Sequence, residues 1–196
     1  MNLTLGTLLK LKTWLLNPDL VAKTTYDASI AQLGRGIAAQ FEGYCGRKFA
    51  RAERTRMLAG HLCNFVLFAY PVEGVPVVEM NNGGGEYQPA QGHLEKFLPE
   101  SGVVWLSSTD AVLRRVTWTG GYWFDETEDS SGACPDGATP LPEALHFAWL
   151  QQCAHTWAKR QKLGTPINST VSTAEVQQAL IPEVQATLNN YRRFNL

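Results

Sequence analysis

The stretch QFEGYCGRKFARAE occupies residues 40–53 and joins two different sequence patterns. Before it, apolar residues recur at spacings of three and four, which is typical of an amphipathic helix: Ile30, Leu33, Ile37, Phe41 and Tyr44. Gly46 stands where this pattern stops, and glycine is common just after a helix because it adopts a left-handed backbone without steric cost. Five basic side chains follow within ten residues: Arg47, Lys48, Arg51, Arg54 and Arg56. The stretch therefore predicts the end of a helix and the start of another kind of structure.

Three further segments have helical patterns. Leucine-rich residues 3–16 predict a helix that ends at the turn sequence Asn17-Pro18-Asp19, and a loop then continues through Lys23. Residues 141–163 predict a long helix, with Pro142 in its first turn and Gly164 after its end; its predicted buried face carries Leu145, Trp149, Gln152, Cys153 and Trp157. A last helix is expected near Pro182, within residues 174–194.

Residues 52–124 differ from the helical segments. They contain β-branched and aromatic runs separated by turn signals such as NNGGG and TGG, which predict several short antiparallel strands. The polar, acidic stretch at residues 125–139 is expected to be an exposed loop. The predicted fold class is therefore α+β: two N-terminal helices and a long helix at about 141–163, an inserted antiparallel β region, and a C-terminal helical tail.

Composition and charge narrow the function classes. The chain has 196 residues, of which 44% are hydrophobic and 18% charged, as in globular proteins. Residues 1–70 carry nine Lys/Arg against four Asp/Glu, residues 71–140 three against eleven, and residues 141–196 five against three. This segregation favours docking between surfaces of opposite sign over general nucleic-acid binding, which needs a basic stripe. No segment is apolar for long enough to predict a membrane span.

Metal and cofactor sites are weakly indicated. His61 and Cys63, with Cys153 and His155, supply two Cys and two His, but structural zinc usually has wider spacing within each pair. Residues 34–39, GRGIAA, match the dinucleotide pattern G-x-G-x-x-A, yet they lie inside a predicted helix with no strand before it, where a close helix–helix crossing explains the glycines better. The carboxylates of residues 125–129 lack the alternation of a calcium loop. We therefore predict no cofactor and no metal.

The chain also lacks a sharp catalytic motif, and the prediction is that it is not an enzyme. A hydrolase stays a distant alternative, because the members of a catalytic triad meet only in space. Two interpretations of the basic residues 47–56 remain open. They could contact phosphates of nucleic acid, or they could anchor a protein interface, where arginines and aromatic residues concentrate.

Four motifs, in this order, resemble the head–tail connector (adaptor) proteins of long-tailed double-stranded DNA bacteriophages. A Y-x-G-R-x-F motif corresponds to residues 44–49, with Tyr44, Gly46, Arg47 and Phe49. A Y-P-V motif corresponds to Tyr70, Pro71 and Val72. A V-T-Y-x-x-G-Y motif corresponds to residues 116–122, with Gly120, Gly121 and Tyr122, and with Trp118 in place of the usual Tyr. An L-P motif, Leu141 and Pro142, opens the long helix.

The resemblance implies a structural protein of the virion neck, made in the host cytoplasm. It implies a homo-oligomeric ring of about twelve copies, a dodecamer, bound beneath the portal. Such a ring extends the channel through which double-stranded DNA passes during ejection, without sequence-specific binding, and it joins the head to stopper or tail-completion proteins. The motif residues have architectural roles in this interpretation. The alternative is a nucleic-acid- or zinc-binding accessory protein.

The expected domain organisation follows from the same resemblance. Residues 1–163 form one adaptor domain with a β insertion at about 52–124, and residues 164–196 form a linker and a docking helix. This tail, which could pack on a neighbouring chain instead of its own, is the predicted portal-binding arm, with Leu188, Tyr191, Arg192, Arg193 and Phe194 as docking residues.

Overall fold

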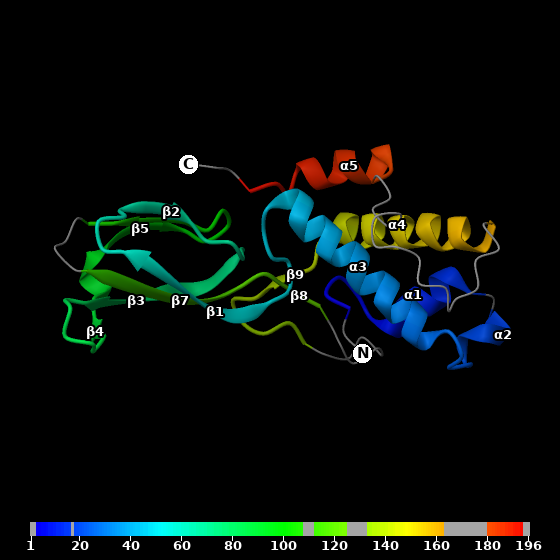
Figure 1. Ribbon diagram of the computed structural model, residues 1–196, viewed down its shortest axis with the longest axis horizontal. Coiled ribbons are helices and arrows are strands. Elements are labelled where there is room, and N and C mark those ends of the chain that lie inside the picture. Colours follow the sequence, from blue (N-terminus) through cyan, green and yellow to red (C-terminus); the bar gives the residue numbers. More distant parts are fainter. Residues whose placement is uncertain (1–2, 17, 108–111, 125–132, 163–179, 194–196) are drawn as a thin grey trace. The chain divides into compact units, whose positions relative to one another are not determined.

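The structure is a computed structural model that describes residues 3–16, 18–107, 112–124, 133–162 and 180–193. The chain divides into two compact units. The helical unit comprises Met1–Cys45, Phe124–Ala133 and Leu141–Arg192, and the β unit comprises Gly46–Trp123, Cys134–Pro140 and Arg193–Leu196. The predicted fold class is confirmed, because antiparallel sheets are inserted between N-terminal and C-terminal helices (Figure 1).

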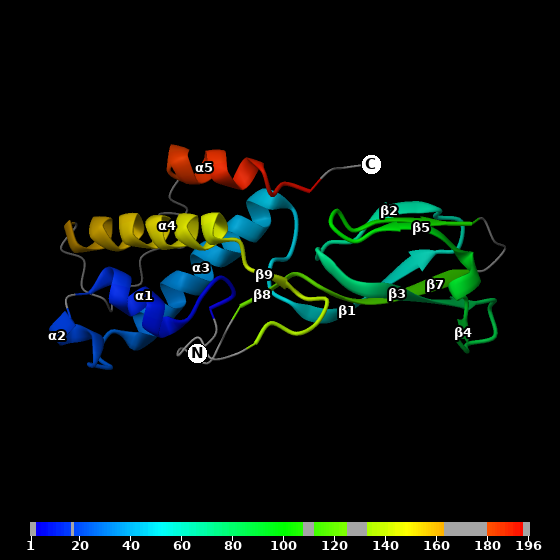
Figure 2. The same cartoon turned by 180° about the vertical axis from the view of Figure 1, so that it is seen from behind.

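The helical unit contains α1 (Leu8–Leu15), α2 (Pro18–Val21), α3 (Asp27–Cys45), α4 (Glu143–Lys162) and α5 (Pro182–Asn189). Helix α3 packs against α1, α4 and α5, and α5 also packs against α4 (Figures 1 and 2). Apolar residues at helical spacing form the shared core: Leu11, Ile30, Leu33, Ile37, Phe41, Leu145, Trp149, Val184 and Leu188. The face predicted for the long helix is buried at all five of its positions.

Two details of the N-terminal segment differ from the prediction. Helix α1 begins at Leu8 and not at residue 3, because extended Thr7 caps it and accepts a hydrogen bond from the backbone N–H of Lys10 at 3.3 Å. Leu3 and Leu5 are nevertheless fully buried, in irregular backbone ahead of the helix. The segment predicted as a loop contains the single turn α2, which starts at Pro18 as prolines often start helices.

The β unit contains two antiparallel sheets and one short parallel pair. The four-stranded sheet has the order β1 (Ala52–Ala59), β7 (Leu113–Gly120), β3 (Val72–Asn81) and β4 (Gln88–Pro89). The three-stranded sheet has the order β2 (Asn64–Val66), β6 (Val103–Leu106) and β5 (Leu94–Leu98), and a short 3₁₀ helix, Gln91–His93, precedes β5. Strands β8 (Tyr122–Trp123) and β9 (Thr139–Pro140) pair in parallel.

The two antiparallel sheets lie in two layers around one apolar core (Figures 1 and 2). Strand β7 shows how the sequence produces this arrangement: Val116 and Trp118 face the core while Arg115 and Thr117 between them face outward, as the period-two geometry of a strand requires. The core residues come from both sheets and include Leu58, Phe65, Val72, Val78, Val104, Leu106 and Val116.

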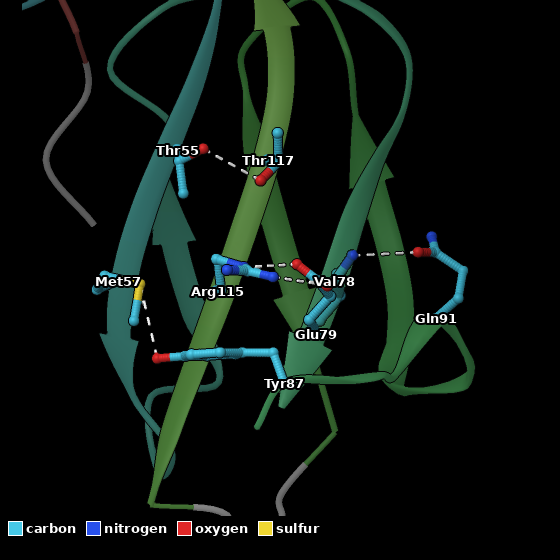
Figure 3. Close-up of polar contacts among 8 residues, drawn as sticks. All are labelled: Thr55, Met57, Val78, Glu79, Tyr87, Gln91, Arg115 and Thr117. Carbon is cyan, nitrogen blue, oxygen red and sulfur yellow. Dashed lines mark hydrogen bonds and ion pairs between the residues drawn. The ribbon is translucent and has the colours of Figure 1, made fainter. Parts of the chain in front are cut away.

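The outer face of the four-stranded sheet is polar and pairs its own charges (Figure 3). Glu79 on β3 lies opposite Arg115 on β7, and the Arg115 Nη2 donates to Glu79 Oε1 at 2.8 Å. This hydrogen bond holds the pKa of Glu79 below its ordinary value. Tyr87 crosses the same face, with the Arg115 guanidinium 4.3 Å from its ring centre and its hydroxyl 3.9 Å from Met57 Sδ.

The two glycines of the GRGIAA stretch both lie inside α3, and they have different environments. A Cβ on Gly34 would lie 2.9 Å from Leu11 and 3.0 Å from Trp149, whose indole N–H donates to the Gly34 carbonyl at 2.9 Å. A Cβ on Gly36 would meet no atom within 4 Å. The predicted close helix crossing therefore exists at Gly34 and not at Gly36.

We expect opposite effects on stability from alanine at these two positions. Gly34→Ala forces Leu11 and Trp149 apart and should lower the free energy of unfolding by about 1–3 kcal/mol. Gly36→Ala should raise it by about 0.5–1 kcal/mol, because alanine loses less backbone entropy in a helix than glycine does. Chemical denaturation of both variants measures the difference. Equal effects at the two positions would contradict the packing described for Gly34.

Candidate functional site

Three sequence motifs that lie far apart in the chain meet at one corner of the β unit. The segment after Gly46 runs beside the segment ending at Pro71, with Lys48 bridged in parallel to Ala69. Ala50 is bridged in the same way to Tyr122. The Gly121 N–H donates to the Pro71 carbonyl at 2.9 Å. The corner, defined here as residues 46–51, 68–72 and 118–122, is therefore a crossing of three backbone segments.

Arg47 occupies the centre of this corner. Its side chain is only 5% exposed, and its guanidinium carbon lies 3.4 Å from the centre of the Tyr70 ring. It also lies 5.3 Å from the ring centres of both Phe49 and Tyr122, and these two rings stack on each other. One residue from each of three motifs thus surrounds the cation, which cation–π attraction stabilises in a desolvated place.

The corner depends on glycines where backbones approach most closely. Gly46 follows α3 with φ +65°, as predicted for the residue that ends this helix. Gly121 has φ +108°, and a Cβ there would lie 2.6 Å from the Ala50 carbonyl oxygen. A Cβ on Gly120 would lie 2.4 Å from the Ala69 carbonyl oxygen. That same oxygen accepts the indole N–H of Trp118 at 2.9 Å, so Trp118 uses the polar group that distinguishes it from phenylalanine.

The remaining predicted motif residues lie outside the group of aromatic rings around Arg47. Pro71 is buried immediately before β3, and Val72 opens this strand and enters the core. Tyr44, Leu141 and Pro142 belong to the helical unit. Tyr44 donates its hydroxyl hydrogen to Asn189 Oδ1 at 2.8 Å, and the Pro142 carbonyl accepts the N–H groups of Leu145 and His146 at the start of α4.

The basic run at residues 47–56 contacts its own chain. Arg51 forms a two-point ion pair with Glu73, in which Nη2 lies 2.9 Å from Oε2. Arg54 lies over the Phe68 ring and donates a hydrogen bond to the Ala50 carbonyl. Arg56 lies over the Phe65 ring and donates a hydrogen bond to the Val66 carbonyl. Lys48 is exposed. Since most of these side chains are fixed within the β unit, they do not form the exposed stripe that duplex binding needs.

The predicted docking residues lie in two places. Leu188 is fully buried in the helical unit, because α5 packs on α3 and α4 of its own chain. Leu188 therefore has a core position in the single chain described, and its role in docking stays a prediction. Arg192 is exposed, 5.5 Å above the Tyr44 ring, and Tyr191 is half-buried. Phe194 lies outside the described residues.

The sequence does not predict that Arg193 lies in the β unit, beside Val66. Its Nη2 donates to the Val66 carbonyl at 2.6 Å. Its Cβ is close to the chain after α3, because a Cβ added to Gly46 would lie 3.8 Å from it. Burial, together with the charge of Arg56, lowers the pKa of Arg193. The sequence shows Arg193 only as one of two adjacent arginines near the end of the chain, and no local pattern indicates that it returns to the segment after α3.

The metal and thiol alternatives gain no support from the geometry. His61 and Cys63 belong to the β unit, whereas Cys153 and His155 belong to the helical unit. Within the ranges that the structure describes, no group of three or more His, Cys, Asp or Glu residues gathers as metal ligands would. Burial raises the pKa of the Cys153 thiol, which keeps it protonated and a poor nucleophile at neutral pH. In the same described ranges, no helix combines the length and apolar character needed to span a membrane.

Comparison with known proteins gives a likeness of fold over nearly the whole chain. No family model and no curated protein sequence matches. A chain from the neck of an empty GTA particle, in a structure computed with C6 symmetry, matches with a TM-score of 0.64 and 16% identity, covering 96% of this chain and 90% of that one. The two chains share one fold. A chain from the virion of a native gene transfer agent (GTA) particle matches over the same shares, with a TM-score of 0.59 and 16% identity.

Proposed function

We propose that this protein is a structural component of the neck of a phage-like particle. More specifically, it acts as an adaptor that forms a ring beneath the portal, extends the DNA channel and offers a platform to stopper or tail-completion proteins. The single observation that carries the proposal is the near-complete likeness of fold to a chain from a GTA neck, with both chains covered to 90% or more. Localisation in the virion neck and a non-enzymatic role follow from the same proposal.

The Arg47 corner supports an architectural role. Arg47, Phe49, Tyr70, Gly121 and Tyr122 come from three motifs, and all five serve to fix three crossing segments of the β unit. The Arg47 guanidinium lies against the three aromatic rings, and a Cβ on Gly121 would meet the backbone of Phe49 and Ala50. An arrangement of this kind gives a rigid module that keeps its shape in repeated copies, and rigidity at an interface lowers the entropy lost on assembly.

The proposed docking surface is formed by residues that follow α5. Because Leu188 belongs to the core of the helical unit, removal of the tail would damage the fold as well as any docking surface. Exposed Arg192 is therefore the better residue to test. It follows α5 and lies above Tyr44, so we assign it, with Tyr191, to the surface that meets the portal.

Native mass spectrometry on the purified chain, alone and mixed with its cognate portal ring, tests the proposal. We expect a ring of defined stoichiometry on the portal. Arg192→Glu should weaken this binding about tenfold, equivalent to about 1.4 kcal/mol. Lys159→Glu, at an exposed position on α4, is the matched charge-reversal control and should bind like the wild type. A chain that stays monomeric and ignores the portal would refute the adaptor role, and a bound zinc ion would favour the accessory-protein alternative.

A further inference from the structure

Strand β1 lies at one edge of the four-stranded sheet, where β7 is its pairing partner. The two strands pair along the whole of β1, and just after it the Gly60 N–H donates to the Val112 carbonyl at 3.1 Å. Because backbone groups alternate in direction along an antiparallel strand, this contact shows that the even-numbered residues of β1 hydrogen-bond to β7. Glu53, Thr55 and Met57 therefore direct their N–H and C=O groups to the other side.

This other side of β1 is an open sheet edge. Among the residues that the structure describes, none hydrogen-bonds to the backbone N–H and C=O groups of Glu53, Thr55 and Met57. All three residues are exposed. Figure 3 shows Thr55 and Met57 on β1, with Thr117 and Arg115 of β7 beside them. An open edge of this kind can bind a further strand through main-chain hydrogen bonds.

The opposite edge of the same sheet is covered. Strand β4 pairs with β3 at Glu79 and Met80, and the Gln91 side chain continues this pairing beyond β4. Its Oε1 accepts the Val78 N–H at 3.2 Å, and its Nε2 donates to the Pro76 carbonyl at 3.0 Å (Figure 3). Because a primary amide offers the same donor and acceptor as a peptide group, Gln91 takes the place of a strand here. The open edge at residues 53–57 has no such cover in the described part of the chain.

Two arginines set the charge beside the open edge. Arg54 and Arg56 alternate with the open-edge residues and point to the inner side of β1, over the rings of Phe68 and Phe65. Both are half-buried, and within the described ranges neither forms an ion pair. A strand added to β1 brings its own inner side chains opposite these guanidinium groups. Carboxylates are favourable there, because opposite charges directly across a strand pair attract.

The same arginines disfavour a second copy of β1 as the added strand. An antiparallel pair of β1 strands centred on Thr55 places Arg54 of each strand opposite Arg56 of the other. A pair centred on either arginine places that arginine opposite its own counterpart. Like charges directly opposite each other destabilise a strand pair. The complementary strand is therefore an acidic one from a different protein.

We propose that the open edge of β1 is a docking site for an extended acidic segment of another protein. The segment binds as an antiparallel strand, with carboxylates opposite Arg54 and Arg56. Main-chain hydrogen bonds to Glu53, Thr55 and Met57 supply affinity, and the two arginines select the acidic sequence. This inference goes beyond the proposed function and does not require ring formation, so a chain that forms no ring can still be tested for it.

A labelled peptide tests the backbone pairing on the full chain. The probe is fluorescent Ser-Thr-Glu-Val-Glu-Thr-Ser, whose valine and threonines pair with β1 in the proposed register while its glutamates face the arginines. N-methylation of the valine and both threonines should weaken binding at least about tenfold, because it removes the N–H groups that donate to β1. N-methylation of both glutamates, whose N–H groups face away, is the matched control and should change affinity less than about threefold. Equal losses, or no binding of the parent peptide, would overturn the site.

Variants of the protein test the location and the charge. Thr55→Pro should abolish peptide binding and keep the pairing with β7, because proline is tolerated at an edge where the N–H faces solvent. Arg54→Gln combined with Arg56→Gln should weaken binding at least about fivefold and reduce its dependence on salt. Lys96→Gln, at an exposed position on β5, is the control and should bind like the wild type. If the folded double variant binds as tightly as the wild type, the acidic selectivity is wrong.

Hydrogen exchange on the free chain decides the matter even if Thr55→Pro fails to fold. The amides of Glu53, Thr55 and Met57 should exchange fast in the monomer, those of Arg54 and Arg56 slowly, and the peptide should slow the first set. Protection of the first set in the free monomer would mean that the edge is already covered, which overturns the proposal. Protection that grows with protein concentration, without peptide, would assign the edge to a second copy and overturn the acidic partner.

Discussion

Alanine at Gly121 is expected to lower the free energy of unfolding of the β unit by at least about 3 kcal/mol. Two costs add at this position. The backbone has φ +108°, which an L-residue with a Cβ adopts only under strain. The new methyl group would also lie 2.6 Å from the Ala50 carbonyl oxygen and 2.7 Å from that of Phe49. Because both obstacles are backbone atoms of residues 46–51, this segment must separate from residues 118–122.

The measurement is thermal and denaturant unfolding, with hydrogen exchange to locate the loss. A change of this size should lower Tm by roughly 6–12 °C in a chain of this length. Gly120→Ala should behave similarly, since its Cβ would lie 2.4 Å from the Ala69 carbonyl oxygen. Gly84→Ala, in the same unit with nothing within 4 Å of its Cβ, is the matched control and should change little. Wild-type stability in Gly121→Ala would contradict the described crossing.

The elements of this fold are largely predictable from local pattern, and their pairing is not. Spacings of three and four mark α3 and α4, and β-branched runs with turn signals mark the region from β1 to β8. The strand order β1-β7-β3-β4 joins β1 to a strand more than fifty residues later in the sequence. Pairing of this kind depends on the packing of whole layers, which no local spacing records.

The residues of the candidate site are likewise predictable from the sequence, whereas their contacts are not. The resemblance selects Arg47, Phe49, Tyr70 and Tyr122 as motif residues. Only the folded chain shows that the three aromatic rings meet around the Arg47 guanidinium. A basic run in a sequence looks the same whether its side chains are exposed or lie over aromatic rings. Only the structure shows that Arg47 is buried in the corner and that Arg51, Arg54 and Arg56 contact other residues of the β unit.

The packing partner of α5 is a further property that local sequence spacing does not determine. Val184 and Leu188 are spaced by four, which predicts a buried face on α5, but spacing does not say which chain buries it. In the structure the helical unit does so. The Cys45 thiol contacts the Leu188 carbonyl at 3.5 Å, and the Tyr44–Asn189 hydrogen bond lies beside it. Both contacts join the end of α5 to the last turn of α3.

Leu188→Ala is accordingly expected to lower the free energy of unfolding of the helical unit by about 3 kcal/mol, within the range of 2–5 kcal/mol for a buried leucine. The side chain is fully buried between elements of its own chain, so its removal leaves a cavity beside α3 and α4. Denaturant unfolding gives the size of the loss, and hydrogen exchange should show α5 opening first. Gln185→Ala, at an exposed position on the same helix, should change stability by less than about 0.5 kcal/mol.

The same variant separates the two roles considered for α5. If Leu188 is a core residue, Leu188→Ala loses stability in the free chain, and portal binding weakens only in proportion to the opened fraction. A stabilising ligand or lower temperature should then restore binding. If instead α5 leaves its own chain to dock, Leu188→Ala should leave the free chain as stable as Gln185→Ala and still lose portal binding. That second result would return Leu188 to the portal interface, and Arg192 would then be its neighbour on the docking surface.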